Sequence, residues 1–228
     1  MHWKMKWCNG NGCFLVFIAL WSLAACKDTK ETEKLSRTAH LPYYRDASFS
    51  PHWLEKDSDT IRSFHRIPDF EFVNQLGDTI TQETFGNKIY VADFFFTSCP
   101  GICPKMTANM SLLQKEFIAD DGVLLLSHSV TPERDSVPVL KSYGANKGVD
   151  PNKWHLVTGE RKQIYDLGRD AYFVEEDLGV PKDVNDFLHT ENFVLIDTER
   201  HIRGIYNGLN KTAIAQLIAD IKTLKSEN

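Results

Sequence analysis

The sequence lacks the excess of basic side chains that nucleic-acid-binding proteins use against phosphates. Its 26 lysines and arginines are outnumbered by 31 aspartates and glutamates, giving a net charge of -5, so no nucleic-acid partner is expected. It also lacks the run of about 20 apolar residues that an ordinary membrane span needs. Internal repeats and low-complexity blocks are absent too. A chain of 228 residues with 42% apolar side chains is therefore expected to form one well-buried domain.

The N-terminus has the pattern of an export signal. Lys4 and Lys6 give it a positive start, residues 13–25 form a short apolar stretch, and a polar tract follows. This order predicts a signal peptide over residues 1–25. The ending Leu-Ala-Ala-Cys26 resembles the bacterial lipoprotein box, in which the cysteine is acylated and becomes the first mature residue. We therefore expect a bacterial lipoprotein, anchored to a membrane through lipid on Cys26 and facing the extracytoplasmic (periplasmic) side.

Thiols become scarce once this processing is considered. Cys8 and Cys13 leave with the signal peptide and Cys26 takes the lipid, so only Cys99 and Cys103 remain in the mature domain. In an oxidising compartment such neighbours form a disulfide unless something keeps them reduced or metallated. A purely structural bridge is the alternative, but its very short loop would constrain little of the unfolded chain. The pair is the candidate functional site.

The rest of the chain divides into a tether and one domain. Residues 26–60 are charged and broken by prolines, which predicts a tether, although the aromatic residues Tyr43, Tyr44 and Trp53 indicate that part of it packs onto the domain. Residues 61–225 are expected to form an α/β domain with a sheet core. The expected elements are a hairpin at 69–81, strands at 88–96, 123–130, 154–157, 192–198 and 202–206, and helices at 105–117, 138–143, 163–172 and 212–224.

Cys99 and Cys103 lie between the apolar strand 88–96 and the helix 105–117. Ligand-binding groups favour this carboxyl edge of an α/β sheet, and the i, i+4 spacing at a helix start turns both sulfurs toward one side. The helix dipole and unpaired N–H groups lower thiol pKa values there, so we expect both thiolates to form readily. Pro104 suits the first helical turn. Thiolates bind soft metals and also attack disulfides, which leaves two chemistries open.

A histidine could complete such a site as a third ligand, and the chain has eight. His189 lies in the loop just before strand 192–198. If that strand runs antiparallel to strand 88–96, its starting edge coincides with the edge that carries Cys99. Two thiolates and an imidazole suit copper in either oxidation state, and zinc by geometry. His128 lies near the carboxyl end of its strand, where its neighbours offer nothing special.

Three segments carry a resemblance. Residues 94–104 read Phe-Phe-Phe-Thr-Ser-Cys-Pro-Gly-Ile-Cys-Pro, residues 129–135 read Ser-Val-Thr-Pro-Glu-Arg-Asp, and Leu-His-Thr occupies 188–190. In this order and spacing they resemble the Sco/SenC family. The resemblance implies a thioredoxin-like fold with a central mixed sheet flanked by helices and an N-terminal β-hairpin. It also implies one copper ion per domain, Cu(I) or Cu(II), bound by Cys99, Cys103 and His189.

The same resemblance implies a partner and a task. A family member delivers copper, or reducing equivalents, to the dinuclear copper site of cytochrome c oxidase subunit II, and would receive its copper from a periplasmic donor. Gly101 and Thr131 depart from the family pattern, because many members have acidic residues at both places. Their replacement removes carboxylates that could tune the site. Residues 133–135 are expected to begin the next helix or to form surface ion pairs.

Two functions from different classes follow. A copper-binding metallochaperone, which is not an enzyme, is favoured over a thiol–disulfide reductase that acts on the client's cysteines. Oxidoreductases of the thioredoxin superfamily usually have two residues between their cysteines and a proline before the antiparallel strand, whereas this chain has three residues and His189-Thr190. A peroxidase of the peroxiredoxin sort is disfavoured, because it would need an isolated peroxidatic cysteine in a different motif and the sequence has none. The phenylalanines of residues 94–96 and the methionines Met106 and Met110 are expected in the core.

Overall fold

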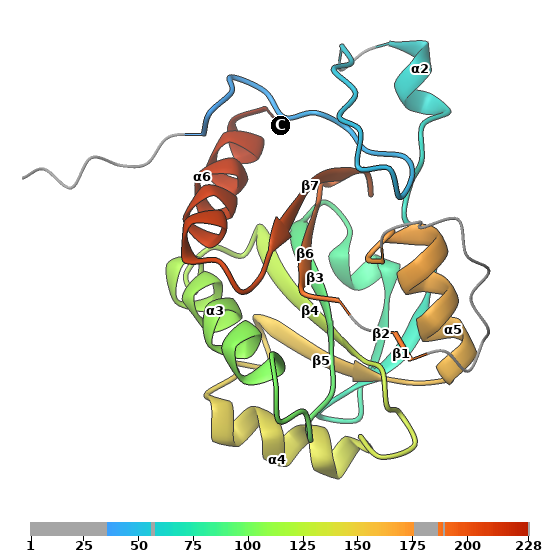
Figure 1. The fold of residues 1–228 in the computed structure, drawn as a ribbon, viewed down its shortest axis with the longest axis vertical. Helices are drawn as coiled ribbons and strands as arrows, with labels where there is room; N and C mark the ends of the chain where they lie inside the picture. Colours follow the sequence, from blue (N-terminus) through green and yellow to red (C-terminus); the bar gives the residue numbers. More distant parts are fainter. Residues whose placement is uncertain (1–35, 56–57, 176–186, 189, 228) are drawn as a thin grey trace, which may run out of the picture. The chain divides into compact units, whose positions relative to one another are not determined.

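The computed structural model describes residues 36–55, 58–175, 187–188 and 190–227 (Figure 1). Within them a seven-stranded mixed sheet has the strand order β2-β1-β5-β4-β3-β6-β7. The strands are β1 (Glu71–Asn74), β2 (Thr79–Thr81), β3 (Ile89–Phe95), β4 (Val123–Ser129), β5 (Trp154–Thr158), β6 (Asn192–Ile196) and β7 (Ile202–Asn207). The predicted hairpin is the pair β1–β2, joined through Gly77, which has a φ of 90° that glycine adopts without strain.

The strand directions decide which loops can meet. β3 pairs in parallel with β4, and β4 in parallel with β5, so all three end at one edge of the sheet. β6 runs antiparallel to β3, with Tyr90 opposite Ile196 and Ala92 opposite Val194. The condition on which the argument for His189 depends, an antiparallel strand after it, is therefore met. The chain enters β6 at the same edge where β3 leaves for Cys99.

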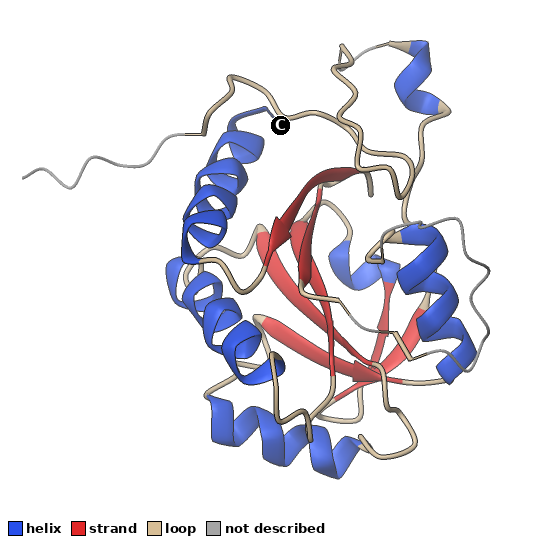
Figure 2. Cartoon of the chain, viewed as in Figure 1, coloured by secondary structure: helices blue, strands red, loops and turns tan. Residues whose placement is uncertain are grey.

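Helices lie on both faces of the sheet (Figure 2). The helices of the described ranges are α2 (Asp59–Arg62), η1 (Gln82–Phe85), α3 (Cys103–Glu116), α4 (Val137–Lys147), α5 (Arg161–Asp166), η2 (Leu167–Ala171) and α6 (Lys211–Glu227), and α2 lies apart from the sheet. Side chains of β3 alternate between the faces, as in any strand. Val91 and Phe95 share a core cluster with residues of α3, α4 and α6, whereas Tyr90 and Phe94 share one with α5 and η2. The predicted α/β fold with a central mixed sheet is confirmed.

The helix expected at 163–172 changes character halfway. It is α-helical to Asp166, and the five residues of η2 then form a π-helical turn, in which the Tyr172 N–H donates to the Leu167 carbonyl at 2.9 Å. Gly168 lies in this turn, where an added Cβ would be 2.9 Å from Leu188 Cδ2 and 3.0 Å from Phe94 Cε1. Glycine therefore lets the turn approach the sheet closely. Apolar spacing alone does not register such a change of helix type.

Part of the segment predicted as a tether packs against β7. Tyr44 forms a β-bridge with Ile202, and the Tyr43 side chain is buried, while Trp53 remains 53% exposed. The buried guanidinium of Arg203 donates to the carbonyls of Leu41 at 2.7 Å and Pro42 at 3.1 Å. This packing lies at the start of β7, at the same end of the sheet as the start of β3, and so at the end opposite to Cys99.

Candidate functional site

The cysteine loop connects the central strand to a helix. β3 ends at Phe95 and α3 begins at Cys103, with Pro104 in its first turn as predicted. The Cys99 N–H donates to the Phe96 carbonyl at 3.3 Å, which closes a turn before the helix. Cys99 is partly exposed and Cys103 is buried, and neither forms a disulfide within the described part of the chain. The structure thus brings the two sequence-predicted thiols together at the carboxyl edge of the sheet.

The two thiols differ in acidity. Burial alone would raise the pKa of Cys99, but hydrogen bonds outweigh it and lower that pKa below its usual value. The donors are the Cys103 thiol and the backbone N–H groups of Cys103, Gly101 and Ile102. These N–H groups belong to the start of α3, where they lack partners inside the helix. The Cys99 thiolate is therefore easier to form than that of an ordinary cysteine, which is the expected direction.

Cys103 behaves in the opposite way. Burial raises the pKa of Cys103 to about 12, and the hydrogen bond that its thiol donates to Cys99 adds to the effect. The expectation of two easily formed thiolates is thus correct for Cys99 and wrong for Cys103, because α3 and the sheet enclose the second sulfur. A nearby positive ion would reverse this preference, since a coordinating thiol is deprotonated.

A buried carboxylate, Asp93, lies on the same face of the sheet as Cys103 and belongs to a short series of hydrogen bonds. Asp93 of β3 is buried and accepts a hydrogen bond from Ser127 Oγ, which in turn accepts one from Trp154 Nε1 at 2.8 Å. Burial raises the pKa of Asp93 to about 7, although the Ser127 hydrogen bond opposes the shift. Negative charge on Asp93 contributes to the raised pKa of Cys103. Sequence reasoning missed Asp93, although an acid inside the apolar strand 88–96 is a visible signal.

A second buried carboxylate corrects an expectation. Among residues 133–135, Glu133 does form a surface ion pair, with Arg161 at 3.6 Å. Asp135 is instead fully buried and accepts hydrogen bonds from Thr97 and Thr131. The expectation of a helix start is also wrong, because α4 begins at Val137. Asp135 points toward the cysteine loop because the loops after β3 and β4 leave the sheet side by side.

His189, the predicted third ligand, lies outside the described residues, as does Cys26, the predicted lipid site. The residues beside position 189 are well anchored. Leu188 is buried, and the Thr190 hydroxyl donates to the Val174 carbonyl at 2.7 Å. The ring of Phe187 packs edge-on against Phe96, with 5.3 Å between centroids. The chain therefore passes the end of β3 just before it reaches position 189.

The remaining histidine at this edge, His128, faces the other side of the sheet. Its ring is fully buried and stacks on Phe94 at 4.7 Å between centroids, with Phe72 and Tyr172 also in contact. Neither ring nitrogen has a partner in normal hydrogen-bond geometry among the described residues, although the Asp93 backbone lies close enough to oppose the pKa shift weakly. Burial lowers the pKa of His128 to about 3. Its surroundings are unusual after all, and long-range packing creates them.

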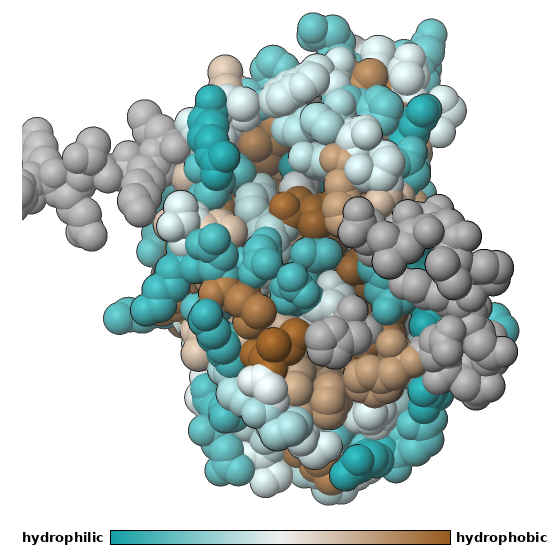
Figure 3. Space-filling model, viewed as in Figure 1, coloured by the Kyte–Doolittle hydropathy of each residue, from teal (hydrophilic) through white to brown (hydrophobic). Residues whose placement is uncertain are grey.

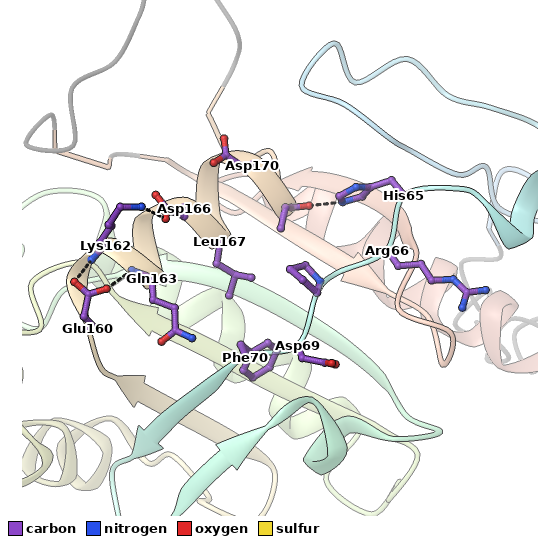
Figure 4. A pocket seen from close by; sticks show the side chains of 12 residues that line it. His65, Arg66, Asp69, Phe70, Glu160, Lys162, Gln163, Asp166, Leu167 and Asp170 are labelled. Atoms are coloured by element: carbon purple, nitrogen blue, oxygen red, sulfur yellow. Dashed lines mark hydrogen bonds and ion pairs between the residues drawn. The ribbon is translucent and has the colours of Figure 1, made fainter.

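The surface elsewhere holds pockets without cysteine. Segment 65–70 and α5 enclose one of about 530 Å³ (Figure 4), lined by His65, Phe70 and Leu167 among others and not by either cysteine. The face in Figure 3 is mostly hydrophilic, with apolar side chains gathered near its centre.

Met106 and Met110 are fully buried, which confirms their predicted place in the core. Of the helices in the described ranges, none is long and apolar enough to span a membrane.

Comparison with known proteins places this geometry. The SCO1/SenC family model matches residues 58–226. A SCO1/SenC family lipoprotein from Bacillus anthracis is 32% identical, with 71% of this chain and 95% of that chain covered and a TM-score of 0.62. BsSco, a Sco-family cytochrome c oxidase assembly protein with a disulfide switch, is 30% identical. The match covers 72% of this chain and 95% of that chain, with a TM-score of 0.60. Copper-bound ScoI of Bradyrhizobium japonicum is 25% identical. The match covers 69% of this chain and 98% of that chain, with a TM-score of 0.54. The predicted thioredoxin-like fold is confirmed.

Proposed function

The chain belongs to the SCO1/SenC family, and on that basis we propose that it is a copper-binding metallochaperone for the dinuclear copper site of cytochrome c oxidase. The observation that carries the proposal is the pair of neighbouring thiols at the start of α3, one of which has a lowered pKa. Thiolates are the ligands that soft Cu(I) prefers. The copper-bound state of ScoI and the oxidase-assembly role of BsSco support the proposal.

The proposed ligands are Cys99, Cys103 and His189, which hold one copper ion per domain. Two sulfurs and one imidazole suit Cu(I) and tolerate Cu(II). Because the Cys103 thiol is protonated in the metal-free protein, binding must release its proton. Copper affinity should therefore fall as pH falls. The packing of Phe187 on Phe96 supports the placement of His189 near the cysteine loop.

Location follows from the N-terminus. Lipid on Cys26 would hold the domain on the extracytoplasmic side of a bacterial membrane, where a periplasmic donor supplies copper and oxidase subunit II receives it. The lipoprotein character of the Bacillus anthracis relative supports this anchor. Cys26→Ala should release the protein from the membrane fraction. Continued fractionation with membranes would show that the apolar segment itself is the anchor.

Thiol–disulfide reduction is the second candidate, and the unequal thiols favour it. The Cys99 thiolate would attack a client disulfide and form a mixed disulfide, releasing one client thiolate. Cys103, once deprotonated, would then attack the Cys99 sulfur and release the second client thiolate. The client gains two electrons and the Cys99–Cys103 pair becomes a disulfide. The disulfide switch of BsSco fits such chemistry.

One experiment separates these functions. The reduced protein is titrated with Cu(I) and Cu(II), in parallel with Cys99→Ser, Cys103→Ser and His189→Ala, and is then mixed with an oxidised oxidase subunit II domain. We expect copper binding to weaken in every variant. Equal copper binding by all three variants would refute the ligand assignment. Retained copper binding without reduction of the oxidised client would refute the reductase.

A further inference from the structure

Asp135 joins three parts of the chain at one carboxylate. It has no exposed surface. Its Oδ1 accepts a hydrogen bond from Thr97 Oγ1 at 2.5 Å, and its Oδ2 accepts one from the Thr97 N–H at 3.2 Å. Oδ2 also accepts hydrogen bonds from Ser129 Oγ at 2.6 Å and Thr131 Oγ1 at 3.0 Å. Four donors compensate the cost of burying the charge, which makes the cluster rigid.

The cluster lies beside the cysteine loop because of strand pairing. β3 and β4 are parallel with Phe95 opposite Ser129, so residues 97 and 131 both follow the sheet by the same short distance. Thr97 precedes Cys99 by two residues. Its neighbour Phe96 accepts a hydrogen bond from the Cys99 N–H at 3.3 Å, and the Phe96 backbone N–H donates to the Cys103 sulfur. One short segment thus contacts both cysteines.

We propose that Asp135 is a positioning residue, which holds the backbone and the hydroxyl of Thr97 and thereby sets the distance between the Cys99 and Cys103 sulfurs. Two bonds to one threonine define both its location and its rotamer, so segment 96–99 cannot shift without breaking them. The proposal deepens the proposed function, since these sulfurs are the suggested copper ligands. Its effect on the thiol pair is nevertheless measurable without copper.

The same geometry gives Thr131 a task. A carboxylate at position 131 would place a like charge beside Asp135, whereas the threonine hydroxyl donates a hydrogen bond to Oδ2. The departure at Thr131 therefore supports the Asp135 cluster in this chain. This role depends on a donor hydroxyl at position 131.

The test compares Thr97→Val, which removes the hydroxyl with little change of shape, with Thr97→Ser, which keeps it. Asp135→Ala removes the whole acceptor. The metal-free protein is equilibrated with glutathione, in which two glutathione thiols are oxidised to one glutathione disulfide for each Cys99–Cys103 disulfide that is reduced. Ile80→Ala, in the hairpin strand β2, is the control for general destabilisation, because it removes buried apolar atoms far from the cysteine loop.

We expect Thr97→Val and Asp135→Ala to shift the equilibrium toward the Cys99–Cys103 disulfide by about tenfold, or about 30 mV, because the reduced arrangement loses the bonds that hold it. Thr97→Ser should stay close to the unaltered protein, and Ile80→Ala should lose stability without changing the equilibrium. An unchanged equilibrium in Thr97→Val would overturn the proposal, and this comparison decides even if Asp135→Ala does not fold.

Copper provides the second readout. Competition with a Cu(I) chelator should show weaker binding in Thr97→Val than in Thr97→Ser. If the unaltered protein binds no Cu(I) while Thr97→Val still shifts the glutathione equilibrium, the proposed function fails and the positioning role of Asp135 stands. If the unaltered protein binds Cu(I) and Thr97→Val matches it in both measurements, the positioning role fails and the proposed function stands.

Discussion

Replacement of His128 by leucine should make the free energy of unfolding less sensitive to acid. The imidazole is fully buried among Phe94, Phe72 and Tyr172, and burial lowers its pKa to about 3 from an ordinary 6.5. Below pH 6.5 the unfolded chain binds a proton at His128 that the folded chain does not bind. Because the folded pKa is the lower one, stability is retained above about pH 7 and falls as the pH drops.

The size of the effect follows from these two pKa values. At pH 5.5 the free energy of unfolding should be about 1.4 kcal/mol lower than at pH 8 on account of His128, and at pH 5 about 2 kcal/mol lower. His128→Leu should lose this slope. It should also gain on the order of 1 kcal/mol at every pH, because two ring nitrogens without a well-formed hydrogen bond leave the core.

Urea unfolding of the metal-free, reduced protein, followed by tryptophan fluorescence from pH 5 to pH 8, measures both terms. Other buried groups, among them His155 and His65, whose pKa values burial also lowers, titrate in both proteins. The difference between variant and unaltered protein therefore isolates His128. Parallel pH profiles between pH 5 and 6.5 would refute the reasoning, since they would mean that the folded imidazole accepts its proton as readily as the unfolded one.

Three further outcomes can be checked. Asp93→Asn should stabilise the metal-free protein by on the order of 2 to 4 kcal/mol at pH 8 and by little at pH 4. The reason is that the folded pKa of Asp93, about 7, lies above its unfolded value. A gain in the free energy of unfolding that does not grow with pH would contradict this. Gly168→Ala should cost about 1–3 kcal/mol in urea unfolding through overpacking, whereas Gly101→Ala, with nothing within 4 Å of the added Cβ, should change stability by less than about 0.5 kcal/mol; equal losses would refute the close approach at Gly168. Iodoacetamide at pH 7 should modify Cys99 at least about tenfold faster than Cys103, as read by mass spectrometry, and equal rates would disprove the unequal acidity of the two thiols.

Much of the fold was predictable from local pattern. Nearly continuous apolar runs such as 88–96 and 123–130 indicate strands buried on both faces, and β3 and β4 are found there. The amphipathic spacing of residues 212–224 likewise corresponds to α6. The boundaries were less well predicted, since α4 extends to Lys147 and stops only where Gly148 adopts a φ of 69°. Such ends depend on backbone conformation rather than on apolar spacing.

The sequence by itself determined the location of the thiol pair. Cys99 and Cys103 lie at a strand–helix junction, and this follows from their order along the chain, which no later packing can change. Only the tertiary structure decided how the two thiols differ. Burial of Cys103 against the sheet raises its pKa, and the start of α3 lowers that of Cys99.

Tertiary structure also decided which carboxylates accompany the pair. Asp93 lies under Cys103 and Asp135 lies behind Thr97 because β3 and β4 pair in parallel and bring residues 34 to 38 positions apart into contact. Residue type along a chain reports what a side chain can do. Its pKa and its partners depend on which distant segments exclude water around it, and that is a property of the folded chain alone.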